Sequence, residues 1–409
     1  MAGRRDIQQQ GISEQRGWEM NNQEHSGLPL LTYKTDFQQS FRFNHPDQFK
    51  TLMLETLAHG ASDIFVQPTK PIVTSIDGRL YAVMTRELDD SEVKLILKWA
   101  ADRETAQSDI LEGRPVNGRY ELFDPTKRME SGARLRHAYR VNAVPIYTEG
   151  ATSAQIVLRA IPTDPPTPEQ VGLSDEILSY MTPRDGIVYV AGATGSGKTT
   201  TLAATLHYIL INDTPIKGNI VTYEEPIEFD FSRILSRHSI IVQTQIPTMM
   251  KTFYEAIREA MRRAPKLIML GELRDEETIR AAVEASLTGH TVFATAHANS
   301  VAAVMRRLIS RFPETERATA IFDIVETTRF IMAQRLVPKV GGGRIAVREY
   351  LAFDESIRER LSELSDMGKV TRVVQQIVDG RGHSFAKEGE RLLAAGLIDE
   401  AVARELRES

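Results

Sequence analysis

A glycine-rich run near the middle of the chain has the residue types and spacing of a phosphate-binding loop. Residues 192–201 read Gly-Ala-Thr-Gly-Ser-Gly-Lys-Thr-Thr-Thr. In a Gly-x-x-x-x-Gly-Lys-Thr loop, backbone N–H groups converge on the α- and β-phosphates, the lysine reaches the β- and γ-phosphates, and the following hydroxyl can ligate Mg²⁺. We therefore expect nucleotide contacts from Gly192, Thr194, Gly195, Ser196, Gly197, Lys198, Thr199 and Thr200, with Thr199 as the metal ligand.

The sequence on either side of this run favours a strand, a loop and a helix. Residues 186–191 are apolar and β-branched, and residues 202–210 place apolar side chains at helical spacing. The N-terminus of such a helix adds its dipole and free N–H groups to an anion site. The alternative, a glycine-rich turn that binds nothing, does not explain this context.

Hydrolysis also needs carboxylates that orient water and complete the metal shell, and two apolar strands end on them. Residues 220–223 run into Glu224 and Glu225, with Glu228 close behind, and residues 267–271 deliver Glu272. A carboxylate just past a buried strand lies where a phosphate-loop sheet presents groups to the γ-phosphate and Mg²⁺. The alternative is that these glutamates are solvated strand ends.

A histidine stands at each end of another apolar strand over residues 291–296. His297 follows this strand, where it could sense the γ-phosphate, and His290 precedes it. A histidine beside a core strand can equally be a hydrogen-bonded structural residue. The spacing does not indicate metal ligation.

Composition bounds the class of protein. The chain has 409 residues, of which 42% are hydrophobic and 26% charged, so it can bury two or three ordinary globular cores. Its formal net charge of -5 gives no general affinity for nucleic acid. No cysteine is present, and the sequence shows neither a secretory signal nor a membrane-spanning run. We expect a soluble protein, or one peripheral to a membrane.

Turn and linker signals along the chain predict its domain organisation. Residues 1–27 are polar and predict a mobile tail. Residues 28–161 predict a first domain. Its expected elements are a helix over 49–58, a turn at Asp77-Gly78, a helix over 91–101 and strands over 134–144 and 155–160. A proline-rich linker covers 162–174. Alternating strands and helices over 175–340 favour a doubly wound α/β sheet. After Gly341-Gly342-Gly343, residues 341–409 are predicted to turn helical.

The order of the motifs resembles the secretion or traffic ATPase family. Residues 191–202 resemble its Walker A motif, 223–229 its Asp box, 270–278 its atypical Walker B motif, 288–300 its His box, and 333–337 its late Gln-Arg-Leu motif. Within the family the chain looks most similar to PilT-like motors. The insert near 124–131 and the segment 348–354 look more like the DotB/TraJ branch of type IVB secretion and conjugation. Glu225 departs from the family, which commonly has aspartate there.

The resemblance implies a homohexameric ATP hydrolase with ATP and Mg²⁺ as ligands. Each subunit would carry an N-terminal PAS-like α+β domain and a C-terminal RecA-like α/β domain, and arginines of the first domain would serve the nucleotide. The matching residues are Arg136, Arg140 and Arg159, and a guanidinium beside the γ-phosphate stabilises the transferring group. A basic, solvated strand face is the alternative.

The resemblance further implies a motor in the cytoplasm that is attached to the inner membrane through the membrane components of a secretion, conjugation or pilus machine. A nucleic-acid-translocating RecA-like hexamer is the alternative function. That class needs a basic channel with aromatic side chains, whereas this chain has two tryptophans and a negative net charge, so we expect no direct nucleic-acid binding.

Overall fold

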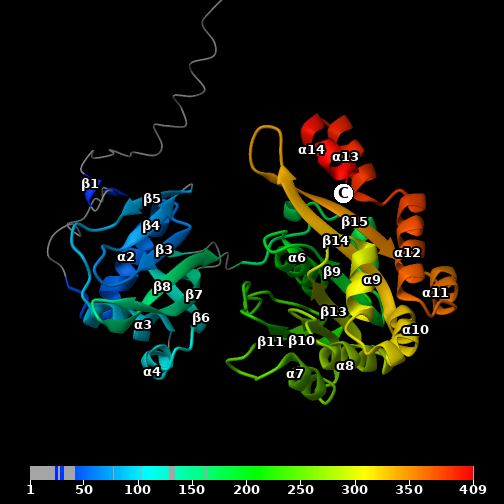
Figure 1. Cartoon of the computed structure of the whole chain (residues 1–409), viewed down its shortest axis with the longest axis horizontal. Coiled ribbons are helices and arrows are strands. Elements are labelled where there is room, and N and C mark those ends of the chain that lie inside the picture. Colours follow the sequence, from blue (N-terminus) through cyan, green and yellow to red (C-terminus); the bar gives the residue numbers. More distant parts are fainter. Residues whose placement is uncertain are drawn as a thin grey trace, which may run out of the picture. The chain divides into compact units, whose positions relative to one another are not determined.

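The computed structural model describes residues 24–25, 28–31, 42–76, 78–101, 103–128, 134–161 and 164–408. It divides into two compact units, Met1–Thr163 and Asp164–Ser409, which are described separately below (Figure 1). Most of the predicted mobile tail over 1–27, part of the insert near 124–131 and the first two residues of the predicted linker lie outside the described residues.

The first unit contains an antiparallel sheet with helices packed on one face. Its six strands have the order β5-β4-β3-β8-β7-β6, and alternate residues such as Tyr139 and Val141 enter a core shared with the helices. The elements are β1 (Glu24–His25), β2 (Leu28–Pro29), α2 (Pro46–Ala58), β3 (Asp63–Val66), β4 (Val73–Ile76), β5 (Arg79–Ala82), α3 (Asp90–Ala101), α4 (Ala106–Leu111), β6 (Val116–Arg128), β7 (Arg134–Thr148) and β8 (Ala151–Ile161).

The second unit contains a seven-stranded sheet of order β11-β10-β12-β13-β9-β14-β15, in which only the β14–β15 pair is antiparallel. Strands β9 and β13 are fully buried, because helices cover both faces of the sheet (Figure 1). The strands are β9 (Gly186–Ala191), β10 (Gly218–Glu224), β11 (Ser239–Gln245), β12 (Pro265–Leu270), β13 (Thr291–Ala296), β14 (Thr328–Pro338) and β15 (Arg344–Ala352).

Many helices of this unit begin at polar caps. Ser174, Thr252, Asp275 and Ser300 each accept a backbone N–H bond with the side chain, which satisfies a donor that the first helical turn leaves open. The helices are η1 (Glu169–Val171), α5 (Asp175–Met181), α6 (Lys198–Ile211), α7 (Phe253–Ala260), α8 (Glu276–Leu287), α9 (Val301–Ile309), η2 (Glu314–Glu316), α10 (Arg317–Thr327), α11 (Glu355–Ser362), α12 (Met367–Arg381), α13 (Phe385–Ala394) and α14 (Glu400–Arg407).

The C-terminal region turns helical later than the sequence predicted. Helices α11 to α14 confirm a helical end to the chain, but residues 344–352 form strand β15 and not a helix. Val347 and Leu351 are fully buried in this strand, which pairs along its length with β14. The glycines over 341–343 therefore join two antiparallel strands, and pairing with β14 holds residues 344–352 extended although Arg348 and Glu349 are buried beside Val347 and Leu351.

No described helix is long and apolar enough to cross a lipid bilayer.

Candidate active site

The phosphate loop, residues 192–197, connects the buried strand β9 to helix α6. Two of its glycines are required by the backbone. Gly192 has a φ of 150° and Gly197 one of 86°, and a Cβ at Gly192 would lie 2.4 Å from the Gln334 carbonyl oxygen, while one at Gly197 would lie 2.9 Å from Gln334 Nε2. Only glycine combines these torsion angles with so little space. The loop thus presents backbone N–H groups at the N-terminus of α6.

Lys198 lies at the start of α6 with its side chain folded onto this loop. Its Nζ donates hydrogen bonds to the carbonyl oxygens of Gly192 at 2.8 Å and Ala193 at 3.0 Å, and the residue is 9% exposed. Burial lowers the pKa of Lys198, whereas the carboxylates of Glu272 and Glu228 raise it. A cation held in this way can transfer its donors from carbonyl oxygens to phosphate oxygens without leaving the site.

The predicted carboxylates surround one small cavity beside the loop. The cavity has a volume of about 70 Å³, and α6 contributes Thr199 to its wall. Strands β10 and β12 deliver the acidic residues, because their parallel carboxyl ends meet at this edge of the sheet. The remaining lining residues that could act on a ligand are Glu224, Glu225, Glu228, Glu272, Arg274 and Thr295.

Glu272 is the carboxylate with the most defined surroundings. Its side chain is 13% exposed, Arg274 Nε donates to its Oε2 at 2.7 Å, and His297 Nε2 lies 3.5 Å from its Oε1. Burial and the nearby Lys198 lower the pKa of His297, against the opposite effect of Glu272, so the neutral imidazole is favoured at pH 7. Arg274 also pairs with Glu225 at 3.0 Å, which links the ends of β10 and β12.

Glu224 and His290 are held differently. Glu224 is buried, and its Oε1 accepts hydrogen bonds from Thr222 Oγ1 at 2.7 Å and Gln243 Nε2 at 3.0 Å, which fixes its orientation at the end of β10. His290 Nδ1 lies 3.0 Å from the Ala285 carbonyl oxygen, at the end of α8 and away from the carboxylates. This contact fits the structural alternative for His290.

The residues around the loop fit Mg²⁺ and a phosphate ligand. Thr199 offers a hydroxyl, the surrounding carboxylates offer hard oxygen donors, and Ser196 Oγ is buried without a hydrogen-bond partner among the described residues. In the described part of the chain no three acidic or histidine side chains form a ready metal cage. A magnesium ion held by one hydroxyl, substrate phosphates and water-mediated carboxylates agrees with this donor set.

The predicted arginines lie on the sheet of the first unit, on the face opposite its helix-packed core. In the strand register Arg140 of β7 stands opposite Arg119 of β6 and Arg159 of β8. Arg159 bonds Asp63 at 2.6 Å, whereas Arg140 is exposed and makes no ion pair within the described residues. Arg136 differs, because it is 8% exposed and its Nη1 lies 3.4 Å from Glu121.

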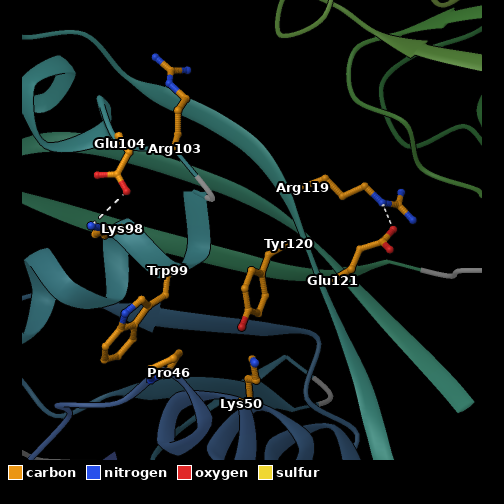
Figure 2. A pocket seen from close by; sticks show the side chains of 9 residues that line it. All are labelled: Pro46, Lys50, Lys98, Trp99, Arg103, Glu104, Arg119, Tyr120 and Glu121. Atoms are coloured by element: carbon orange, nitrogen blue, oxygen red, sulfur yellow. Dashed lines mark hydrogen bonds and ion pairs between the residues drawn. The ribbon is translucent and has the colours of Figure 1, made fainter.

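A larger cavity of about 710 Å³ borders strand β6 in the same unit. Figure 2 shows Arg119 hydrogen-bonded to Glu121 on one side of it and Lys98 paired with Glu104 on the other. Its cations are thus matched by nearby carboxylates, and none of its residues belongs to the phosphate loop. The lining residues are Pro46, Lys50, Lys98, Trp99, Arg103, Glu104, Arg119, Tyr120 and Glu121.

Several residues of the site were not found from the sequence. Arg274 lies in the segment 270–278 that resembles the Walker B motif, and its position two residues after Glu272 is the signal that could have found it. Arg119 could be found only from the strand register, since β6 was not predicted. Gln334, which contacts the loop, and Arg348, which contacts Gln334, lie more than 130 residues further along the chain.

Fold and site together define a RecA-like phosphate-loop ATPase. The model of the family described as type II/IV secretion system protein matches residues 45–343. The type IV pilus retraction ATPase PilT of Pseudomonas aeruginosa is 31% identical over 357 residues, which cover 87% of this chain and 96% of PilT. Its similarity extends over both units.

Two solved structures are similar to this chain over most of its length. The ATPase DotB of Yersinia pseudotuberculosis is 49% identical, with a TM-score of 0.79 over 94% of this chain and 99% of that one. The pilus retraction motor PilT with bound ADP is 28% identical, with a TM-score of 0.75 over 90% and 97%. The chain therefore belongs to the type II/IV secretion ATPase family. It is a PilT-like ATP hydrolase, similar to DotB, and a secretion or pilus motor.

Proposed function

We propose that this chain is the homohexameric ATPase motor of a type IVB secretion, conjugation or type IV pilus-like machine, and that it works in the cytoplasm against inner-membrane components. One observation carries its ATPase part: Thr199, Glu224, Glu225, Glu228 and Glu272 line one cavity beside the phosphate loop. The high identity to DotB over nearly the whole chain supports the assignment to a secretion machine.

The side chains divide the work of phosphoryl transfer. The loop N–H groups and Lys198 hold the phosphates, and Thr199 with the β10 and β12 carboxylates would hold Mg²⁺, which neutralises phosphate charge when bound. Glu272 orients water, because it is an acidic group whose position two partners fix. His297 reports on the γ-phosphate through Glu272, and the arginines of the first unit supply positive charge to the transferring group.

The Glu272→Gln variant tests the catalytic carboxylate. This substitution keeps the shape of the side chain and removes its charge, so ATP should still bind while kcat falls by about 100-fold or more, the scale of general-base loss. Steady-state hydrolysis and equilibrium binding of ATP should be measured on the full chain. Glu277→Gln is the matched control, since Glu277 is exposed on the following helix. Loss of ATP binding by Glu272→Gln would instead assign Glu272 to metal or loop support.

Ring formation is tested by light scattering on the full chain. We expect the particle to have the mass of about six subunits in the presence of a non-hydrolysable ATP analogue. In a separate experiment, the chain used as bait in a membrane extract should retain inner-membrane proteins of one secretion or pilus machine. A monomer at every concentration and nucleotide state would contradict the hexameric motor.

Adding DNA to the hydrolysis assay distinguishes the proposed secretion motor from a nucleic-acid-translocating motor. We expect single-stranded and double-stranded DNA to leave the rate of ATP hydrolysis unchanged within about two-fold, because the chain carries a net charge of -5. A salt-sensitive, DNA-stimulated rate would favour the nucleic-acid-translocating function instead.

A further inference from the structure

A chain of hydrogen bonds connects the phosphate loop to residues 171–172, near the start of the second unit. Gln334 of β14, which is 2% exposed, donates from Nε2 to the Ser196 carbonyl oxygen at 2.7 Å. Its Oε1 accepts from Thr201 Oγ1 at 2.9 Å and from Arg348 Nε at 2.8 Å. The one amide thus contacts the loop, helix α6 and strand β15.

Arg348 continues the chain of hydrogen bonds to residues 166–172, here called the entry segment, which form part of the predicted linker 162–174. Its Nη1 and Nη2 donate to the carbonyl oxygens of Gly172 and Val171, each at 2.6 Å. These carbonyls lie at the end of η1, only a few residues after the unit begins at Asp164. A second bond fixes the same segment, because His207 Nδ1 on α6 lies 3.1 Å from the Pro166 carbonyl oxygen.

The charge of Arg348 is unusual for so buried a place. Its three hydrogen bonds all go to neutral oxygens, and burial lowers its pKa to about 10, so the guanidinium is still protonated at pH 7. Burying a cation without a hydrogen-bonded carboxylate is costly, and apolar residues of equal volume would often be at least as stabilising. The packing of β15 alone therefore does not explain why a cation stands at this position.

The direction of the hydrogen bonds indicates what the charge does. Arg348 polarises the Gln334 amide, which makes Nε2 a better donor to the Ser196 carbonyl oxygen. That oxygen belongs to the same peptide group as the Gly197 N–H. A peptide whose carbonyl accepts a strong hydrogen bond has a stronger N–H donor, and the loop N–H groups are the ones that hold phosphate.

We propose that Gln334 and Arg348 are positioning residues of the phosphate loop, and that through them the entry segment, residues 166–172, controls the affinity of the loop for nucleotide. The proposal rests on the nucleotide-binding function of the loop. When residues 171–172 are in place, the Ser196–Gly197 peptide is oriented and polarised for phosphate. A displacement of this segment removes two bonds from Arg348 and weakens the loop.

The first test compares ADP binding by full-length variants in calorimetry. Gln334→Glu keeps an acceptor for Arg348 and Thr201 but loses the donor to Ser196, and Arg348→Met loses both bonds to the segment. We expect either variant to raise the Kd for ADP by about 10-fold, the scale of one hydrogen bond to a charged network. The KM for ATP should rise in parallel, while kcat at saturating ATP stays within about two-fold. Arg344→Met, at an exposed position on the same strand, is the control.

The second test probes the segment itself. Gly172 has a φ of 63°, and Gly172→Ala strains the backbone whose carbonyl accepts from Arg348. We expect a several-fold weaker ADP affinity in the wild-type background and no further loss in the Arg348→Met background, because the two changes break one connection. Gly396→Ala is the matched control, since Gly396 has a φ of 68° with open space around it in the α13–α14 turn.

The outcomes separate this inference from the proposed function. Failure of the wild-type chain to bind ADP would overturn the nucleotide site itself. Wild-type ADP affinity in all of the variants, with only a lower Tm in the absence of nucleotide, would show that Gln334 and Arg348 are merely structural. Additive effects of Gly172→Ala and Arg348→Met on ADP affinity would show that the segment does not act on the loop through Arg348. Should Arg348→Met fail to fold, Arg348→Lys, which keeps the charge and loses the forked donors, takes its place.

Discussion

The Lys198→Ala variant is expected to lose ATP turnover entirely. Lys198 is the one cation that the loop motif itself directs at the β- and γ-phosphates, and its Nζ is already held against the loop carbonyls of Gly192 and Ala193. Without it, no group of the loop replaces the charge that balances the phosphates. Phosphate release by the purified full chain should fall to the background rate at any ATP concentration.

Thermal unfolding separates this effect from misfolding. Removal of Lys198 also removes the cost of burying a cation, so the Tm without nucleotide should be unchanged or slightly higher. In the wild-type chain, ADP at 100 times its Kd should add about 2.7 kcal/mol of stability, and this gain should disappear in the variant. Lys217→Ala is the control, because Lys217 is half-exposed and its ion pair, with Asp213, is local to its own turn. Hydrolysis that survives in Lys198→Ala would refute the phosphate-loop assignment.

The ATPase sheet could be predicted from the sequence because its strands are buried on both faces. Residues 187–191 and 291–296 are continuous apolar runs, and they form β9 and β13 almost as predicted. The carboxylates follow the same logic. Glu224 and Glu272 come directly after such runs, so parallel pairing of β10 and β12 brings them to one edge. The sequence cannot show that Arg274 then bridges Glu225 and Glu272.

The missed parts depend on contacts between distant segments. Strand β15 carries Arg348 and Glu349 between the buried Val347 and Leu351, and both charged residues are buried too, so no simple alternation marks it as a strand and its pairing with β14 was needed to find it. Gln334 was part of a recognised motif, but its role follows only from the register that places it beside Gly192 and opposite Arg348. The roles of such side chains depend on contacts with segments distant in the sequence, and a local sequence pattern does not contain that information.

The role of each arginine in the first unit also could not be predicted from spacing alone, because the strand register decides which of them is exposed. Spacing on β7 allows Arg136 and Arg140 to share a face, but Arg136 is nearly buried beside Glu121, whereas Arg140 is exposed between Arg119 and Arg159. Like charges directly across strands destabilise a sheet. Glu121 and Asp63 offset the charges of Arg119 and Arg159, whereas Arg140 makes no ion pair within the described residues, so we propose Arg140 as the arginine that serves the γ-phosphate.

The Arg140→Ala variant should therefore lower kcat by about 1,000-fold, the scale of an arginine supplied to phosphoryl transfer. Its Tm should not fall, because Arg140 is exposed and makes no ion pair within the described residues that the substitution would break. Arg136→Ala should instead lower the Tm, since it leaves a buried space next to Glu121. Hydrolysis, unfolding and light scattering should be measured on each full-length variant, with Arg79→Ala, at an exposed position of strand β5, as control.

A charge-conserving variant then identifies how the arginine acts. Arg140→Lys keeps the positive charge but loses the planar fork of donors, so its rate should lie between the wild-type and alanine values if the guanidinium binds the transferring group. Equal rates for wild type and Arg140→Lys would reduce the requirement to charge alone. Full activity of Arg140→Ala, in rings of unchanged mass, would leave the alternative in which Arg119, Arg140 and Arg159 form a solvated basic face.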